Sequence, residues 1–337
     1  MKSVQLLGYG GNEALRVNQV PVPEPGAGQL LVKVMAAGVN PVDYKIRDGK
    51  LKPILPLRFP QTLGGELAGV VEKLGPGVSG FNVGESIFAR VDKQQMGAFA
   101  EYAVVDAAHA ARMPSNLSFE EAAGIPLAGL TAWQCLFEVL KLQPKQKILI
   151  HAGGGGVGGL AIQFAKNAGA YVATTASPAA KAVVEAYGAD EIINYREEKF
   201  ETVLSDYDHV LDTVGDDTLL RSFGVIKKGH TVVSVAGVPE PQTAKDIDKG
   251  LLIKSIFWAI SSKIRKAAKK AGVHYRYLFM HPDGKQLSEI AKLIEEGKVK
   301  AKVDRVFDLE KATEAFSYLE TGHAKGKVIL RVRSGRI

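Results

Sequence analysis

The sequence predicts an α/β protein of two domains, one rich in β-strands and one built on a doubly wound parallel sheet. A chain of 337 residues is too long for one ordinary hydrophobic core. Over roughly the first 120 residues, short β-branched runs alternate with turn clusters. From Lys147 onward strand-like and helical patterns alternate, which is typical of parallel strands with helices on both faces. We place the β-rich domain at 1–122, completed by 284–337, and the parallel-sheet domain at 123–283.

The β-rich domain shows strand patterns before a change of texture near residue 116. These strands are expected at 29–39, 67–75, 85–91 and 98–106. After the change, Ser118 followed by Glu121 has the spacing of a helix capping box. Near the C-terminus we expect helices at 285–297 and 309–322, a strand at 302–309, and a closing strand at 326–332 that rejoins the first domain.

The second domain shows six strand patterns and two helical patterns long enough to connect parallel strands. The strands are expected at 147–153, 170–177, 191–195, 209–214, 231–237 and 275–280, and the helices at 157–168 and 178–187.

Composition indicates an ordinary soluble globular protein, with 46% hydrophobic and 23% charged residues. The first residues lack the features of a signal peptide, and no apolar stretch approaches the ~20 residues of a membrane span. Cys135 is the only cysteine, which favours a reducing, cytoplasmic location.

The chain carries a net charge of +7, and much of the excess positive charge lies at 263–270, 298–305 and 331–337. These stretches contain no basic motif interleaved with aromatic residues. They therefore predict solvated faces rather than nucleic-acid binding.

A glycine-rich turn directly follows the 147–153 strand and directly precedes a helix. Within it, Gly153, Gly155 and Gly158 satisfy the G-x-G-x-x-G pattern, and Gly156 and Val157 complete the loop. The first glycine is expected to permit a tight turn, the second to let a diphosphate approach bare backbone, and the third to let helix and strand pack closely. Unpaired N–H groups and the positive end of the helix dipole would then face the phosphates. The loop predicts a dinucleotide site.

The strand after this loop ends without the acid that usually binds the ribose 2′-hydroxyl of NAD. That position falls at about Ala176, with Thr174, Thr175 and Ser177 around it. A carboxylate would repel a 2′-phosphate, whereas hydroxyls and a nearby cation accommodate one. We therefore predict NADPH rather than NADH, with Lys181 on the phosphate and Tyr195 beside the adenosine; the alternative for Lys181 is an ordinary exposed helix lysine.

Taken together, the motifs of the chain resemble those of the medium-chain dehydrogenases/reductases, and most closely their zinc-free quinone oxidoreductases. The matching stretches are "AAGVNPVDYKIRDG" (36–49), "LGGELAGVVEKLGPGVSGFNVGE" (63–85), "AGIPLAGLTAWQCL" (123–136), "HAGGGGVG" (151–158), "GADEIINYREE" (188–198) and "GHAKGKVIL" (322–330). The resemblance implies a GroES-like catalytic domain, a Rossmann-type nucleotide-binding domain, and NADPH-dependent reduction of quinones or α,β-unsaturated carbonyls. It also implies a homodimer joined through the nucleotide-binding domains.

The resemblance also implies residues around the nicotinamide. Asn40 and Tyr44, in "NPVDY", are expected beside its ribose and the substrate pocket, with Tyr44 as a contact residue or a proton relay; water could equally supply the proton. The other implied cofactor contacts are Thr131, Val214, Ala236, Gly237, Phe279 and Met280.

Zinc is not expected. Asn40 stands where zinc-dependent members of the resembled family have a cysteine, and Gly65 stands where they have a histidine. Seven scattered histidines and one cysteine offer no ligand set of usual spacing, and Cys135 and His151 are expected to be structural. Without a Lewis acid to stabilise an alkoxide, the expected acceptors are already electrophilic.

Three alternatives stay open from the sequence. One is an enoyl-thioester reductase on the same scaffold. Another is a non-catalytic NADPH-binding protein, either a redox sensor or an RNA-binding protein. The third concerns the stretch 251–273, which predicts an amphipathic helix over the expected cleft or dimer interface, or else a lid or a membrane-surface contact.

Overall fold

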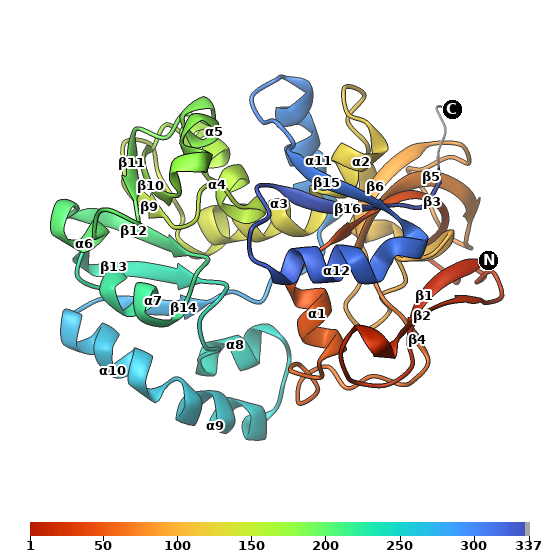
Figure 1. Cartoon of the computed structure of the whole chain (residues 1–337), viewed down its shortest axis with the longest axis horizontal. Helices are drawn as coiled ribbons and strands as arrows, with labels where there is room; N and C mark the ends of the chain where they lie inside the picture. The colour runs from red at the N-terminus through yellow and green to blue at the C-terminus, as the bar shows by residue number, and fades with distance from the viewer. Residues whose placement is uncertain (334–337) are drawn as a thin grey trace. The chain divides into compact units, whose positions relative to one another are not determined.

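The computed structural model describes residues 1–333, so the last four residues of the predicted basic stretch 331–337 lie outside the described residues. The chain divides into two compact units (Figure 1). Unit 1 is Met1–Leu130 with the segment that begins at Pro282, and unit 2 is Thr131–His281. Unit 1 thus includes the start of the helix that follows residue 125, where the Leu127 N–H donates to Glu66 Oε2 at 2.7 Å.

Unit 1 is built on a seven-stranded sheet ordered β15-β16-β3-β5-β6-β8, with β7 paired to β3, and a three-stranded sheet ordered β2-β1-β4. The closing strand β16 pairs antiparallel with β3, which confirms the predicted return of the chain to the first domain. The sequence did not indicate β1, β2 and β4. The strands are β1 (Lys2–Leu6), β2 (Leu15–Gln19), β3 (Gln29–Val39), β4 (Gln61–Thr62), β5 (Glu66–Leu74), β6 (Ser86–Arg90), β7 (Tyr102–Asp106), β8 (Ala110–Arg112), β15 (Val303–Asp308) and β16 (Lys327–Arg331).

Helices of unit 1 close the edges and faces of these sheets. The predicted capping box is confirmed, since the Glu121 N–H donates to Ser118 Oγ at 3.2 Å and the Ser118 N–H donates to Glu121 Oε2 at 2.9 Å. Figure 1 shows α12 lying against β15 and β16. The helices are α1 (Pro41–Arg47), α2 (Phe119–Ala123), α11 (Gly284–Glu295), α12 (Ala312–Glu320), and short 3₁₀ turns at Asn12–Ala14, Ala107–His109 and Leu309–Lys311; α3 (Pro126–Trp133) runs from unit 1 into unit 2.

Unit 2 contains a six-stranded, all-parallel sheet ordered β11-β10-β9-β12-β13-β14. The chain moves outward from β9 in one direction and then, from β12, in the other. Right-handed crossovers consequently place α4 and α7 on opposite faces, as a doubly wound sheet requires. Its strands are β9 (Lys147–Ile150), β10 (Tyr171–Ala176), β11 (Glu191–Asn194), β12 (Tyr207–Asp212), β13 (Ile226–Ser234) and β14 (His274–Tyr277).

The helices of unit 2 are α4 (Gly156–Asn167), α5 (Lys181–Ala186), α6 (Phe200–Val203), α7 (Asp216–Ser222), α8 (Pro241–Asp246), α9 (Leu251–Ile260) and α10 (Ser262–Ala271), with a π-helical stretch at Gln134–Val139 and a 3₁₀ turn at Pro178–Ala180. The single helix predicted over 251–273 is wrong, because the chain breaks at Ser261. Its buried hydroxyl donates to the Phe257 carbonyl and accepts from Arg265 Nε at 3.0 Å, which ends α9 and starts α10. Within residues 1–333, no helix is long and apolar enough to cross a bilayer.

Candidate functional site

The glycine-rich turn lies at the carboxyl end of β9, between β10 and β12, where the strand order reverses. The His151 N–H donates to the Leu211 carbonyl at 3.0 Å, and the Gly153 N–H donates to the Thr175 carbonyl at 3.1 Å. The turn is therefore held by both neighbouring strands. Helix α4 begins directly after it, with Gly155 as its extended N-cap residue. In open parallel sheets, ligands bind at this switch point, with phosphates at the helix N-terminus.

The three motif glycines are needed for different physical reasons. A Cβ at Gly153 would lie 2.2 Å from Thr174 Oγ1, and one at Gly158 would lie 2.4 Å from the Ala152 carbonyl oxygen. Both positions are fixed by packing. A Cβ at Gly155 would meet only the Ala152 carbonyl oxygen, at 3.3 Å, so its backbone faces open space. This fits the approach of a diphosphate to bare main chain. The positive φ of the turn, 52°, is at Ala152.

The buried side chain of His151 holds the glycine-rich turn in place through hydrogen bonds. His151 Nε2 lies 2.9 Å from Ser222 Oγ, which itself donates to the Thr218 carbonyl, so Nε2 carries the proton. His151 Nδ1 then accepts from Thr175 Oγ1 at 3.1 Å, and that hydroxyl accepts from the Ala152 N–H at 3.1 Å. Burial, and secondarily Arg221, lowers the pKa of His151 to about 3, which keeps the ring neutral. His151 is a positioning residue for the loop.

Of the residues predicted to surround the adenosine, at the ends of β10 and β11, some side chains are hydrogen-bonded within the protein and others face solvent. Thr174 Oγ1 donates to the Ile150 carbonyl at 2.7 Å, and the Thr175 hydroxyl is used beneath the loop. Ser177 is half-buried directly after β10, and Tyr195 is exposed directly after β11. The Lys181 side chain is 67% exposed, and its nearest carboxylate, Glu185, is 3.9 Å away. The groups that face solvent at this edge are therefore a hydroxyl, a cation and an aromatic ring.

A buried acid that the sequence analysis did not identify fixes the loops where the nicotinamide is predicted to lie. Asp212 is fully buried at the end of β12, where its Oδ1 accepts from the Val214 N–H at 3.0 Å and the Gly215 N–H at 2.9 Å. Its Oδ2 accepts from Ser234 Oγ at 2.6 Å. Val214 itself is exposed. A polar residue that ends each of two strands, in "LDTVG" and "VSVAG", is the sequence signal that could have indicated this pair.

Ser234 extends the same arrangement to the next loop. Its Oγ accepts from the Ala236 N–H at 3.2 Å and the Gly237 N–H at 2.7 Å. Ala236 and Gly237 line a pocket of about 320 Å³ together with Asp216, Val238 and Ile260. One carboxylate and one hydroxyl thereby set the positions of two loops at the carboxyl edge of the sheet.

The remaining predicted contacts of unit 2 lie at its ends. Thr131 is buried in α3, where unit 2 begins. Phe279 and Met280 are half-buried and follow β14, which ends at Tyr277, three residues before the end of the strand predicted over 275–280.

In unit 1, Asn40 is buried and its side chain is fully engaged. Its Nδ2 donates to Glu66 Oε1 at 2.7 Å, and its Oδ1 accepts from Lys327 Nζ, which also contacts Glu66 Oε1 at 2.7 Å. The Asn40 N–H donates to Asp43 Oδ2 at 2.7 Å, at the start of α1. Asn40 thus joins α1 to β5 and β16.

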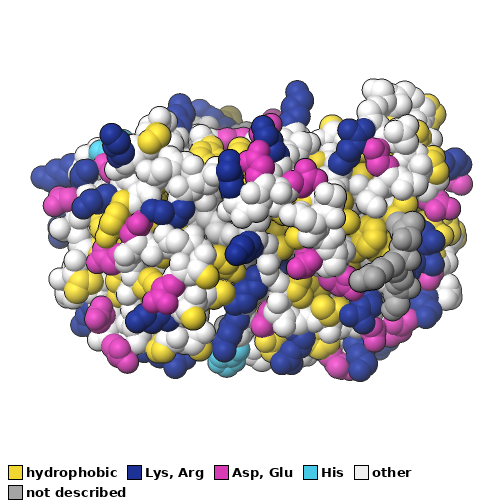
Figure 2. All heavy atoms as spheres, turned by 90° about the horizontal axis from the view of Figure 1, so that it is seen from above, with side chains coloured by type: hydrophobic (Ala, Val, Ile, Leu, Met, Phe, Trp, Pro, Cys, Tyr) yellow, Lys and Arg dark blue, Asp and Glu magenta, His cyan; other side chains and the backbone are white. Residues whose placement is uncertain are grey.

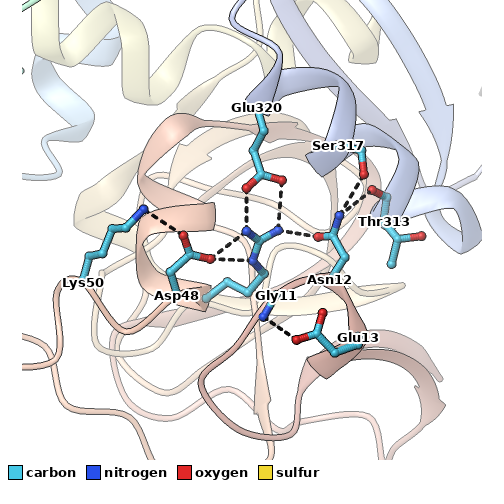
Figure 3. Close-up of polar contacts among 9 residues, drawn as sticks. Gly11, Asn12, Glu13, Asp48, Lys50, Thr313, Ser317 and Glu320 are labelled. Atoms are coloured by element: carbon cyan, nitrogen blue, oxygen red, sulfur yellow. Dashed lines mark hydrogen bonds and ion pairs between the residues drawn. The ribbon is translucent and has the colours of Figure 1, made fainter.

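Helix α1 is held at its other end by Arg47, whose guanidinium bonds Glu320 Oε1 at 2.6 Å and Asp48 Oδ1 at 2.6 Å (Figure 3). Figure 3 shows the Asn12 side chain reaching from this network to Ser317 and Thr313. Tyr44 is half-buried on α1 between the two anchors. Burial, and then the Glu320 charge, raises the pKa of Tyr44, so its hydroxyl keeps its proton at neutral pH.

The residues at the two positions where zinc-dependent members of the resembled family carry ligands do not fit a metal ion. Gly65 carries no side chain, and a Cβ there would lie 2.2 Å from a terminal nitrogen of Arg90. The buried Arg90 guanidinium fills that space and donates to the carbonyls of Gly65 and Val91. The Asn40 amide is bonded to Glu66 and Lys327. Among residues 1–333, no group of three or more His, Cys, Asp or Glu residues is placed to hold a metal.

Comparison with known proteins matches both units. The model of the alcohol dehydrogenase GroES-like domain matches residues 26–115, and that of a zinc-binding dehydrogenase matches residues 187–330. A chloroplastic NADPH-dependent alkenal/one oxidoreductase of Arabidopsis thaliana is 35% identical, over 98% of this chain and 79% of that protein.

Two solved structures extend the comparison to the fold. The quinone oxidoreductase from Coxiella burnetii is 34% identical, with a TM-score of 0.84 over 99% of each chain. The Escherichia coli quinone oxidoreductase complexed with NADPH is 26% identical, with a TM-score of 0.81 over 98% of this chain and 100% of that one.

Proposed function

The chain belongs to the quinone oxidoreductase branch of the medium-chain dehydrogenase/reductase superfamily, and on this premise we propose that it is an NADPH-dependent oxidoreductase of quinones or α,β-unsaturated carbonyls. The observation that carries the proposal is the glycine turn at the switch point of the parallel sheet. There, Gly155 offers bare backbone between two glycines whose own positions packing requires. That arrangement suits a diphosphate at the N-terminus of α4.

NADPH is proposed as the preferred carrier. No carboxylate ends β10, and the groups exposed along that edge are Ser177, Lys181 and Tyr195. Lys181 supplies positive charge for a 2′-phosphate, and its carboxylate neighbour Glu185, at 3.9 Å, lies at the limit of an ion pair. The Tyr195 ring offers a flat apolar surface for the adenine.

The residues of the chain then have to hold the cofactor, orient it and exclude water. When bound, the nicotinamide carrier supplies the hydride for a conjugate reduction. Asp212 and Ser234 hold the 214–215 and 236–237 loops at the edge where the nicotinamide is proposed to lie. Fixed loops of this kind hold the hydride donor in one geometry, which is where proximity effects act. The protonated Tyr44 hydroxyl is a proposed hydrogen-bond donor for the substrate oxygen.

Zinc-independent chemistry is part of the proposal. It is supported by the Arg90 guanidinium that fills the space beside Gly65 and by the bonded amide of Asn40. Conjugated carbonyls accept hydride without a metal because the incoming charge spreads over the enolate. A cytoplasmic location and a homodimer joined through unit 2 also stay predictions.

The proposed function is tested by NADPH oxidation with panels of quinones, enals and enones, with product identification and metal analysis of the active protein. We expect turnover with an electrophilic acceptor, the same rate after chelation, and a lower Kd for NADPH than for NADH. Preference for an enoyl thioester would favour the alternative reductase. Tight NADPH binding without turnover of any acceptor would favour a non-catalytic sensor and refute the enzyme.

A further inference from the structure

Helix α9 exposes an apolar surface. Leu251 is 80% exposed, Leu252 is 75% exposed and Trp258 is 60% exposed, and Ile256 and Ile260 are exposed as well. Phe257 is the one residue of α9 that is buried. A helix that is apolar all round is normally covered on every side. Exposed apolar patches of this kind are typical of interaction surfaces, and here five large apolar side chains are exposed on ten residues.

The next helix, α10, is basic where α9 is apolar. Lys263, Lys266, Lys269 and Lys270 are exposed. The opposite side of α10 packs into the core of unit 2 through Ala268, with Ile264 and Ala271 beside it. From 249 to 282 the sequence contains no Asp or Glu, while Lys249, Lys254 and Arg265 join the four exposed lysines. Arg276 is paired with Glu240 and Asp246. On the face drawn in Figure 2, by contrast, basic and acidic side chains are intermixed.

Contacts between α9 and α10 hold the apolar side chains of α9 and the basic side chains of α10 together. Arg265 of α10 donates to the Trp258 carbonyl at 2.8 Å, and its guanidinium lies 5.3 Å from the centre of the Trp258 ring. Its Nε also bonds the buried Ser261 hydroxyl between the two helices at 3.0 Å. The lysines and the apolar side chains are consequently held in a defined relation to each other.

We propose that α9 and α10 form a docking surface for an anionic phospholipid bilayer. Leucine, isoleucine and tryptophan side chains of α9 enter the boundary between headgroups and acyl chains, while the α10 lysines contact the lipid phosphates. An apolar face beside a row of lysines is the pattern of helices that lie in the membrane interface. Tryptophan favours that boundary, and each lysine near an anionic leaflet adds to the binding.

Charge favours lipid over a second copy of the chain. In a two-fold interface built on this surface, the α10 lysines of both copies would be brought close together, and no acid lies between 249 and 282; of these lysines, only Lys263 lines the pocket that contains Asp216 and Asp217. An acidic polymer would satisfy the lysines but leave Leu251, Leu252 and Trp258 in water. A bilayer with anionic headgroups satisfies both parts. The proposal does not depend on the cofactor or the acceptor.

The test uses the full chain and vesicles of phosphatidylcholine, alone or with about one-third phosphatidylglycerol. We expect co-sedimentation with the anionic vesicles only, weakened roughly tenfold or more when salt shortens the Debye length. The chain has two tryptophans, and Trp133 packs on Phe137 and Phe164. In a Trp133→Phe protein, Trp258 fluorescence should shift to the blue on binding and be quenched by brominated acyl chains.

Matched variants separate the two parts of the surface. Reversing charge at Lys266, Lys269 and Lys270 with Glu should lower the vesicle affinity at least roughly tenfold, because three favourable contacts become repulsive. Leu251→Ser with Leu252→Ser should abolish the Trp258 shift. The control reverses three exposed lysines of unit 1, Lys285, Lys311 and Lys325, and should bind as the parent does.

Three results would overturn the proposal. The first is equal binding by the α10 variant and the unit 1 control. The second is a Trp258 shift that follows protein concentration without lipid, which would assign the surface to a second copy. The third is that a polyanion such as heparin binds as strongly as the vesicles do and Trp258 shows no shift. That result would mean that the lysines alone cause the binding.

Discussion

Asp212 Oδ2 accepts a 2.6 Å hydrogen bond from Ser234 Oγ, across two parallel strands in which these residues are register partners. The carboxylate also fixes the N–H groups of residues 214 and 215, and the hydroxyl fixes those of residues 236 and 237. The two loops at the carboxyl edge of β12 and β13 are thereby joined through one buried pair. Burial raises the pKa of Asp212, and the N–H and O–H donors around it oppose that rise.

The first prediction concerns this pair. In Ser234→Ala the buried carboxylate loses one donor and two loop N–H groups lose their acceptor. We expect a loss of about 1–3 kcal/mol of unfolding free energy, with a lower kcat because the loops no longer hold one geometry. Urea unfolding and NADPH-dependent turnover measure the two effects. Ser205→Ala, at an exposed position of unit 2, should change neither. An unchanged kcat in Ser234→Ala would remove the positioning role.

The second prediction separates the glycines. Gly155→Val is compatible with the backbone there, where φ is −84° and ψ is 173°, and its Cβ meets only one atom, at 3.3 Å. We expect near-parental thermal stability and loss of NADPH binding by at least roughly a hundredfold, because the side chain occupies the place of the diphosphate. Gly158→Val instead drives a Cβ into the Ala152 carbonyl and should lower the stability by about 1–3 kcal/mol. Equal effects of the two substitutions on melting would contradict the assignment.

The third prediction concerns cofactor choice. Lys181→Ala should weaken NADPH binding roughly tenfold while changing the Kd of NADH little, since only NADPH carries the 2′-phosphate. Fluorescence titration with both nucleotides at low salt measures the ratio. The matched control is Lys199→Ala, an exposed lysine in the same unit. A parallel loss for both nucleotides would make Lys181 an ordinary surface lysine.

The fourth prediction concerns pH. Burial, opposed chiefly by the Asn40 N–H, raises the pKa of Asp43 to about 7. The folded state therefore holds a proton that the unfolded state has released above about pH 3.9. This contribution to stability is complete below that pH and is lost as the pH rises to about 7. Each pKa unit corresponds to about 1.4 kcal/mol.

Asp43→Asn removes this titration and keeps an oxygen acceptor for the Asn40 N–H. Relative to the parent, the variant should therefore gain stability between pH 4 and 7, when urea unfolding is followed across that range. Asp248→Asn, at an exposed turn position with positive φ, should leave the slope unchanged. The same slope in Asp43→Asn and in the parent would show that Asp43 is ionised throughout.

Local patterns were enough for the parts of the fold that depend on spacing along the chain. The alternation after Lys147 predicted the parallel sheet, and the spacing from Ser118 to Glu121 predicted a helix start. The pattern of 29–39 predicted β3 to the residue. The sequence did not indicate the two-residue strand β4, because its pairing with β1, rather than its own composition, makes it a strand.

By itself the sequence determined the fold class, the glycine turn before α4 and the missing acid after β10, because strand and helix periods and turn chemistry are local properties of the chain. Only the tertiary structure decided that Ala152 takes the positive φ, that Thr175 turns inward to His151, and that Asp212 meets Ser234. Those contacts join residues roughly twenty positions apart, and the register of parallel strands selects them. The exposure of α9 was likewise decided by packing, since an apolar sequence alone predicts burial.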